Sequence, residues 1–407
     1  MQKNDHDLTR RGFLATAASG LVTAGLAGLT PAQALAQEAA QTATPKKDVT
    51  FRTLGRTGIK VPIVSIGAMN ADNPELMQAA YEMGIRHFDT AAVYQFGRNE
   101  QMVGRVVKQM GIRDKVIIGT KIHTTEQRRG LTPEQHKTRM LKTLNGCLKR
   151  LKTDYVDILS IHDVGDAAVV ADEAIIETMK EIVKSGKARF TGIATHSNMA
   201  TVINAVTKGG FYDTVLTSFN FTMADDTDLM KAIADAAAAG VGILAMKTQA
   251  GGAQLPNPAS RETYSASVRN LAALKWVMRN ENVHTSIPGC ASLEQVEEDF
   301  SVASNFEYTE EESKFLADNS IKLSLGFCRQ CRRCLASCPG GADIPTLMRT
   351  HMYAAQYSNF HQARYTLDNI PSGQNLSACT SCSECVAQCV RAVDIPKKIA
   401  ELKLIYA

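Results

Sequence analysis

The feature that most constrains this chain is a cysteine pattern that occurs twice near its C-terminal end. The two sets share the spacing C-x2-C-x2-C-x3-C and hold eight of the ten cysteines of the 407-residue chain. Asp-Ile-Pro follows each set at the same distance, so the repeat extends beyond the cysteines. Such an internal repeat predicts two copies of one structural unit. The sets are Cys328, Cys331, Cys334 and Cys338, and Cys379, Cys382, Cys385 and Cys389.

The spacing of these cysteines favours iron–sulfur clusters. Three thiolates with two residues between each and the next can bind one iron–sulfur cube. A fourth thiolate, after a wider gap, can bind the neighbouring cube. The sequence therefore predicts two [4Fe–4S] clusters, in which Cys389 completes the first set and Cys338 completes the second. Zinc is a weaker alternative, since zinc sites usually combine two separate C-x2-C arms. Disulfides are the weakest alternative.

The segment 321–407 resembles the dicluster [4Fe–4S] ferredoxin family, and within it the α-helical subtype. Between the two cysteine sets, "PTLMRTHMYAAQYSNFHQARYTL" has the spacing of apolar residues typical of helices rather than of a hairpin. One position departs from the family pattern. Pro339 follows the first set, whereas Val390 follows the second, so the local turn there is expected to differ.

The first 36 residues resemble a twin-arginine export signal. Arg10-Arg11 precedes a weakly apolar run that ends in Ala34-Leu35-Ala36, a small-residue cleavage pattern. A membrane anchor is disfavoured because the run is short and rich in Gly and Ala. We expect export to the periplasm, a mature start near Gln37 and a linker over 37–48. Twin-arginine export, as the resemblance implies, carries folded proteins, so the cysteines can arrive already bound to metal.

Residues 49–320 alternate short β-rich runs with helical stretches, which predicts a (β/α)8 barrel within an α/β fold. The segment "FRTLGRTGIKV" ahead of the first run predicts a hairpin that closes the barrel floor. The predicted strands are "PIVSIG", "RHFDTA", "KVIIGTK", "YVDILSIH", "ARFTGIAT", "DTVLTSFN", "VGILAMK" and "HTSIPG".

Polar residues follow three neighbouring strands at their carboxyl ends, where the chemistry of such barrels lies. Asp89, Lys121 and His162 end the second, third and fourth runs, and Tyr94 follows in the loop after Asp89. Asp89 and Lys121 could instead be a purely structural buried pair. His123 and His196 also lie near strand ends, and we expect them to line the same mouth.

The stretch from Phe51 to about Asn305 resembles the aldo/keto reductase family, most closely in "FDTAAVYQFGRNEQMVG". The resemblance implies that Asp89, Tyr94, Lys121 and His162 form a catalytic tetrad. In that family the tyrosine donates a proton to a carbonyl oxygen as hydride reaches the carbon. We expect Lys121 to lower the pKa of Tyr94, Asp89 to hold Lys121, and His162 to orient the carbonyl.

The nicotinamide contacts of that family are poorly preserved. Met246 or Lys247 replaces a stacking aromatic residue, and Gly289 and Gln295 replace the basic residues that bind a 2′-phosphate. NADPH binding is therefore expected to be weak or absent. Three residues still lie where cofactor contacts could form: Asn220, Lys247 and Glu298.

These features predict an exported oxidoreductase that acts on a small carbonyl or alcohol, with two [4Fe–4S] clusters connecting the site to a redox partner protein. A carbonyl needs two electrons, so a bound NAD(P) or flavin is predicted as the store. Two alternatives remain: a nicotinamide-dependent reductase with structural clusters, and an electron-transfer subunit without turnover. A net charge of +4 without a basic stripe argues against nucleic acid.

Overall fold

A computed structural model describes residues 49–124, 131–251, 263–319, 326–380 and 382–406. The predicted signal (1–36) and linker (37–48) lie outside the described residues. From Lys47 onward the chain forms one compact unit, which includes both the barrel and the C-terminal region. Within the described part, no helix has the length and apolar character needed to cross a membrane.

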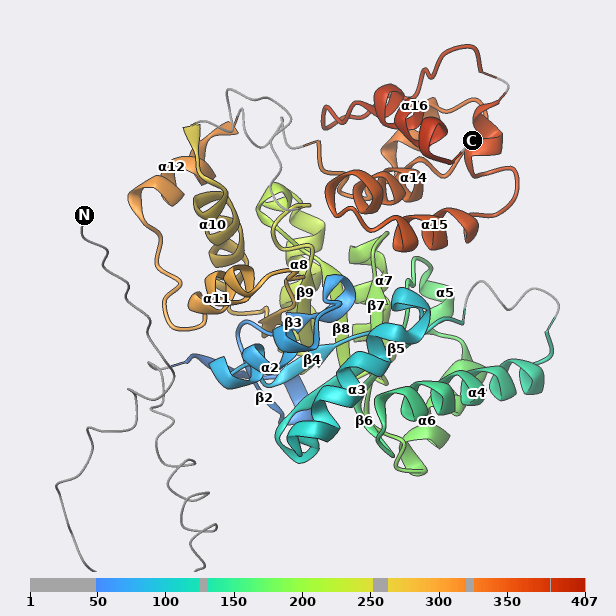
Figure 1. The fold of residues 1–407 in the computed structure, drawn as a ribbon. Helices are drawn as coiled ribbons and strands as arrows, with labels where there is room; N and C mark the ends of the chain where they lie inside the picture. The colour runs from blue at the N-terminus through green and yellow to red at the C-terminus, as the bar shows by residue number, and fades with distance from the viewer. Residues whose placement is uncertain (1–48, 125–130, 252–262, 320–325, 381, 407) are drawn as a thin grey trace, which may run out of the picture. The chain divides into compact units, whose positions relative to one another are not determined.

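Eight parallel strands form the barrel, in the order β10-β9-β8-β7-β6-β5-β4-β3 (Figure 1). Isolated parallel bridges join Val64 to Ser286 and Gly67 to Gly289, and they close the ring between its first and last strands. The predicted (β/α)8 fold is confirmed. The strands are β3 (Ile66–Gly67), β4 (His87–Asp89), β5 (Ile117–Ile122), β6 (Val156–Ile161), β7 (Ala188–Thr195), β8 (Thr214–Ser218), β9 (Gly242–Met246) and β10 (Thr285–Ser286).

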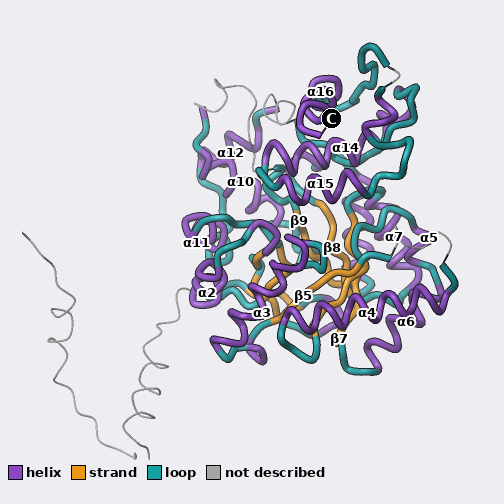
Figure 2. Tube along the Cα trace, turned by 45° about the vertical axis from the view of Figure 1, so that its right-hand side comes forward, coloured by secondary structure: helices purple, strands orange, loops and turns teal. Residues whose placement is uncertain are grey.

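Helices surround this barrel on the outside (Figure 2). Every residue of β5 and β6 is buried, because helices cover one face of these strands and the barrel interior the other. The helices are α2 (Pro74–Met83), α3 (Arg98–Met110), α4 (Pro133–Leu151), α5 (Ala167–Val170), α6 (Glu173–Lys184), α7 (Met199–Gly209), α8 (Thr227–Ala238), α10 (Ala266–Met278), α11 (Leu293–Ser301) and α12 (Glu310–Ala317).

A hairpin of β1 (Phe51–Thr53) and β2 (Lys60–Pro62) closes the barrel floor, as predicted. Leu54 from its turn is fully buried among apolar residues from inside the barrel, including Ile117 and Ile158. Gly55 beside it has φ +49°, and a Cβ there would lie 2.4 Å from the carbonyl oxygen of Gly240. Only glycine allows the turn to approach the barrel this closely.

The C-terminal region is helical between the two cysteine sets, as the apolar spacing predicted. It contains α14 (Ile344–His351), a π-helical turn (Met352–Gln356), α15 (Phe360–Asp368) and α16 (Ile395–Tyr406). Both views place α14 and α15 over one end of the barrel strands (Figures 1 and 2). Tyr353 from the π-helical turn and Ala363 from α15 belong to the same hydrophobic cluster as the barrel core.

Leu54→Ala is expected to lower the free energy of unfolding by about 3 kcal/mol, because it opens a cavity at a fully buried position. Leu404→Ala is the matched control, since that side chain is 88% exposed and should tolerate the change. Urea unfolding followed by circular dichroism measures both. Equal unfolding midpoints for the two variants would contradict the role of the hairpin as the barrel floor.

Candidate active site

The carboxyl ends of three adjacent strands bring predicted catalytic side chains to one mouth. Asp89 ends β4, Lys121 lies one residue before the end of β5, and His162 follows β6. Gly119 on β5 leaves room for them, because a Cβ there would lie 3.1 Å from the carboxylate of Asp89 and 3.2 Å from the ring of His87.

Lys121 forms a buried ion pair with Asp89. Its Nζ also donates a 2.8 Å hydrogen bond to the carbonyl oxygen of Thr90, and it lies 5.2 Å from the centroid of the Tyr94 ring. The Lys121 and Asp89 side chains are only 1% and 8% exposed. Burial of both charges requires such compensation, so the ammonium is held in one position beside the tyrosine ring.

An unusual turn holds Tyr94 at the mouth. Gln95 and Phe96, which follow it, have φ values of +50° and +56°, a conformation that is costly for residues other than glycine. The Tyr94 ring lies edge-on to the ring of His162, with 5.8 Å between centroids. The structure therefore brings all four predicted tetrad residues together.

Burial raises the pKa of Tyr94 above its ordinary value, and the carboxylates of Asp89 and Asp163 raise it further. The prediction that Lys121 lowers this pKa is therefore wrong in direction. The physical reason is that Tyr94 itself is buried, which disfavours the phenolate, and that the nearby ammonium is paired with Asp89. Tyr94 is a neutral phenol near pH 7, in the protonation state that a proton donor requires.

Three imidazoles stand in a row at the mouth. The ring centroids of His123 and His162 are 4.4 Å apart, and those of His162 and His196 are 6.5 Å apart. Burial lowers the pKa of His123 to about 4 and lowers the pKa values of His162 and His196 well below the ordinary value. All three are therefore neutral near pH 7, and each can both donate and accept a hydrogen bond.

Two cavities meet at Tyr94, which lines both. We call the larger, of about 260 Å³, the first cavity. It is bounded by the ends of β3, β4, β9 and β10 and by the π-helical turn of the C-terminal region. Its walls include Asp89, Tyr94, Lys247, Gln295, Asp299 and Gln356.

We call the other, of about 180 Å³, the second cavity. It lies between the loops after β5, β6 and β7 and the helices α14 and α15. His123 and His196 line it, which confirms their predicted place in the pocket wall, and His162 lies between them.

The three predicted nicotinamide contacts lie in different places. Lys247 lines the first cavity, but among the described residues its walls do not include Asn220 or Glu298. The amide of Asn220 is used within the fold, because Nδ2 donates to the carbonyl oxygen of Lys247 and Oδ1 accepts from Thr222. Glu298 lies on α11, beside Asp299, which does line the cavity.

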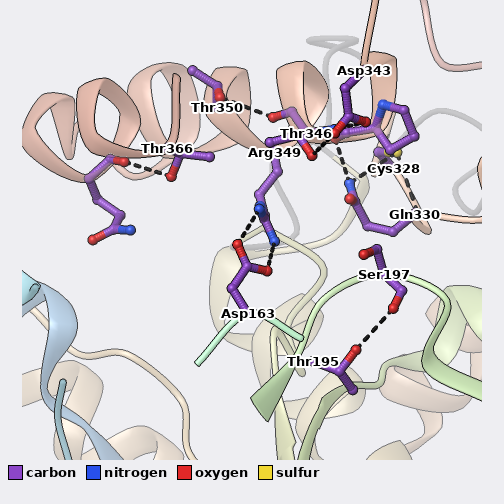
Figure 3. Close-up of polar contacts among 12 residues, drawn as sticks. Asp163, Thr195, Ser197, Cys328, Gln330, Asp343, Thr346, Arg349, Thr350 and Thr366 are labelled. Carbon is purple, nitrogen blue, oxygen red and sulfur yellow. Dashed lines mark hydrogen bonds and ion pairs between the residues drawn. The ribbon is translucent and has the colours of Figure 1, made fainter. Parts of the chain in front are cut away.

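Ionic contacts hold the C-terminal region against the loops at the carboxyl ends of the barrel strands. The guanidinium of Arg349 on α14 donates two 2.7 Å hydrogen bonds to the two carboxylate oxygens of Asp163, just after His162 (Figure 3). Asp225, between β8 and α8, pairs with both Arg329 and Arg391. These arginines lie one residue after Cys328 and two residues after Cys389, so both contacts reach the first predicted cluster site.

Lys247 of the barrel also contacts the C-terminal region. Its Nζ lies 4.7 Å from the ring centroid of Tyr353 and 5.3 Å from that of Tyr357. Burial, together with the cations of Arg349 and Lys121, lowers the pKa of Lys247 to about 7. The lysine is therefore partly neutral near physiological pH, and its charge is sensitive to what binds in the first cavity.

The cysteines converge across the repeat in the arrangement that the spacing predicts. Cys328, Cys331, Cys334 and Cys389 line one small cavity. Burial raises the pKa of Cys328 to about 12, and the thiols of Cys334, Cys331 and Cys389 raise it further. The pKa of Cys379 is likewise raised by burial and by its neighbours Cys338, Cys385 and Cys382.

This donor set fits two [4Fe–4S] clusters. Each group combines three thiols of one set with the fourth thiol of the other, which is how adjacent cubes are held. Over the described residues, no three His, Cys, Asp or Glu side chains converge closely enough for a single metal ion.

Several residues of the mouth were not predicted from the sequence. The cavities at the mouth are also lined by Asp163, Arg349 and Gln356. Arg349 and Gln356 come from the segment between the cysteine sets, for which the sequence pattern predicts only a helix. The sequence signal that could have identified Arg349 and Gln356 is that they are polar residues within an otherwise apolar helical pattern. Asp163 has φ +55°, which its position after His162 does not reveal.

Comparisons with known proteins agree with this architecture. The profile of the aldo/keto reductase family matches residues 67–318, and that of a 4Fe-4S dicluster domain matches residues 327–393. An aldo-keto reductase from Klebsiella pneumoniae, solved in complex with NADPH, superimposes with a TM-score of 0.53 at 21% identity, over 66% of this chain and 94% of that one. This likeness concerns the fold.

Two curated relatives match parts of the barrel. L-galactose dehydrogenase of Arabidopsis thaliana is 28% identical over 292 residues, which is 64% of this chain and 89% of the relative. Aldo-keto reductase YhdN of Bacillus subtilis is 36% identical over 123 residues, which is 30% of this chain and only 37% of the relative.

The buried imidazoles predict a pH dependence of stability. Between about pH 4 and pH 6.5 the unfolded chain binds a proton at His123 and the folded protein does not, so stability falls as the pH is lowered. His123→Asn should therefore lose less stability than the wild type between pH 7 and pH 5, by about 1–2 kcal/mol. Urea midpoints at both pH values measure this difference. Parallel pH profiles for the two proteins would show that His123 is protonated in the folded state.

Proposed function

Since the chain belongs to the aldo/keto reductase family and carries a C-terminal 4Fe-4S dicluster domain, we propose that its two parts form one redox path. The barrel is an oxidoreductase of the aldo/keto reductase type. In the proposal, two-electron chemistry on a carbonyl or alcohol takes place at Asp89, Tyr94, Lys121 and His162, and two [4Fe–4S] clusters exchange electrons with that site and with a redox partner protein.

The observation that carries this proposal is a continuous set of side chains from Cys328 to Tyr94. Cys328 lines a small cavity together with Lys247 and Gln356. Lys247 and Gln356 also line the first cavity, where Tyr94 and Asp89 lie. Lys247 and Gln356 therefore border both the cavity that holds a predicted cluster ligand and the first cavity, which supports electron transfer between them.

Residues of the mouth fit the proton chemistry of carbonyl reduction. The reaction adds two electrons and two protons: a hydrogen reaches the carbon with an electron pair, and the neutral phenol of Tyr94 gives its proton to the oxygen. Solvent then returns a proton to the phenolate, while Lys121, paired with Asp89, stays beside the Tyr94 ring. His162, neutral and next to Tyr94, donates or accepts a hydrogen bond at the substrate oxygen.

The clusters, when bound, supply electrons one at a time, and a nicotinamide or flavin in the first cavity would supply the electron pair. The cavity walls suit a cofactor without a 2′-phosphate. Gln295 and Gly289 offer no cation there, and Asp299, whose pKa is raised to about 7 by burial, would oppose a phosphate when ionised. This supports our expectation of weak NADPH binding.

We expect about eight iron atoms per chain and reoxidation of the reduced clusters by a carbonyl substrate. Tyr94→Phe removes the proton donor, so the reoxidation rate should fall at least about 100-fold. Visible absorbance under anaerobic conditions follows the reaction after reduction with dithionite. Tyr308→Phe is the matched control, because Tyr308 lies outside both cavities.

Three other outcomes would change the assignment. Wild-type rates in Tyr94→Phe, with eight iron atoms present, would reject the tetrad. Turnover with free nicotinamide while the clusters stay reduced would favour a reductase with structural clusters. No carbonyl-dependent reoxidation, together with reoxidation by a protein electron acceptor, would favour an electron-transfer subunit.

We also propose that the protein is exported by the twin-arginine route, on the strength of the motif at Arg10-Arg11. Replacing both residues by lysine, which keeps the charge, should leave the precursor in the cytoplasm with its iron bound. Fractionation followed by immunoblotting measures this. The matched control replaces Lys46-Lys47 in the linker with arginine and should be exported normally. Export of the Arg10→Lys, Arg11→Lys variant at the wild-type level would reject the assignment.

A further inference from the structure

The second cavity combines the proposed reacting groups with side chains that the barrel alone does not supply. Tyr94 and His162 line it from the barrel, whereas Arg349, Gln362 and Asn369 line it from the C-terminal region. The second cavity is therefore complete only when the dicluster domain is in place. Residues that recognise a substrate can thus be sought on α14 and α15 as well as at the strand ends.

The charges around this cavity balance. Two carboxylates and two guanidiniums line it, and they occur as neighbours. Arg349 binds Asp163 through two hydrogen bonds of 2.7 Å, and Arg332 lies 3.9 Å from Asp343 (Figure 3 shows the first pair). Because the three imidazoles are neutral as well, no unpaired charge in the walls favours an anionic or a cationic ligand.

The same walls contain hydrogen-bonding atoms that no other group of the described protein satisfies. His162 Nδ1, Arg349 Nε, Gln362 Oε1 and Asn369 Nδ2 are buried and have no partner. Buried polar atoms normally have one, since leaving them unpaired is costly. The set contains donors, an acceptor and an imidazole that can be either, and hydroxyl groups combine these two roles in one atom.

We propose that the second cavity is the substrate site and that it takes a small, uncharged, polyhydroxylated carbonyl compound or its alcohol, that is, a sugar-like molecule. The inference rests on the proposed function, because the reacting carbon must lie at Tyr94. The hydroxyl groups away from that carbon bind Arg349, Gln362 and Asn369 of the dicluster domain. An apolar aldehyde would leave these groups unpaired, and a sugar acid would place an uncompensated carboxylate among balanced charges.

Binding can be measured without turnover. The iron-loaded Tyr94→Phe protein is titrated by calorimetry with neutral aldoses of three to six carbons, with the matching uronic acids and with straight-chain aldehydes of equal length. We expect at least one aldose to bind at least tenfold more tightly than its uronic acid and than the aldehyde of the same length. Tighter binding of either competitor, or no binding by any aldose, would overturn the proposal.

Gln362→Leu tests the contribution of the dicluster domain. It removes an amide from a side chain that is 6% exposed in the cavity wall, and the affinity for the aldose should fall at least tenfold. Gln101→Leu, on the exposed face of α3, is the matched control and should bind normally. Unchanged binding in Gln362→Leu would place the ligand elsewhere and overturn the proposal.

Two further measurements separate the possible causes of failure. Iron content and circular dichroism show whether Gln362→Leu is folded, and Gln362→Glu, which is nearly isosteric, must also weaken aldose binding if the cavity requires balanced charge. If aldoses bind but no carbonyl compound reoxidises the clusters, the proposed binding site is supported and the proposed redox path is rejected. If straight-chain aldehydes reoxidise the clusters and aldoses do not, the proposed redox path is supported and the sugar-like substrate is rejected.

Discussion

The ion pair between Arg349 and Asp163 is the contact on which the arrangement of the active site depends. It joins α14 of the dicluster domain to the residue that directly follows His162, across 186 positions of the sequence. Burial alone would raise the pKa of Asp163, but Arg349, and then His196, lower it below its usual range. The pair therefore remains charged over the whole physiological range. Its two parallel hydrogen bonds fix an orientation as well as a distance.

This contact places α14 over the barrel mouth, where Asp163 and Arg349 both line the second of the two cavities. Tyr94 lies at the boundary, with the first cavity toward Lys247 and the second toward the three imidazoles. A proton donor at this boundary can serve a substrate on one side while electrons arrive from the other. Burial of Tyr94 at this position also explains why it is a neutral phenol, because burial disfavours the ionised form.

The dicluster domain has two structural roles in this arrangement. Its cysteine loops are held to the barrel through Asp225, which pairs with Arg329, one residue after Cys328, and with Arg391, two residues after Cys389. Its helices α14 and α15 contribute walls to the second cavity, which Tyr94 and His162 also line. In the proposed function this domain both carries electrons and shapes the substrate site, so displacing it would remove the path and the binding groups together.

Features that depend on spacing along the chain can be predicted from the amino-acid sequence alone. The barrel follows from alternating strand and helix patterns, and the positions of Asp89, Lys121 and His162 follow from the ends of those strands. The crossed grouping that unites Cys328 with Cys389 follows from the repeat. Each of these depends on neighbours or on a regular period, so local chemistry is enough to predict them.

The residues opposite the barrel mouth and the ionisation of the buried groups depend instead on how the chain packs. The pairing of Asp163 with Arg349 joins distant segments, and no local pattern marks either partner. The protonation of Tyr94 depends on which charges are compensated and on how much water is excluded, and the sequence prediction failed there because it treated Lys121 as free to act on the phenol. Burial and electrostatic compensation are properties of the packed molecule, and they arise only when the chain is folded.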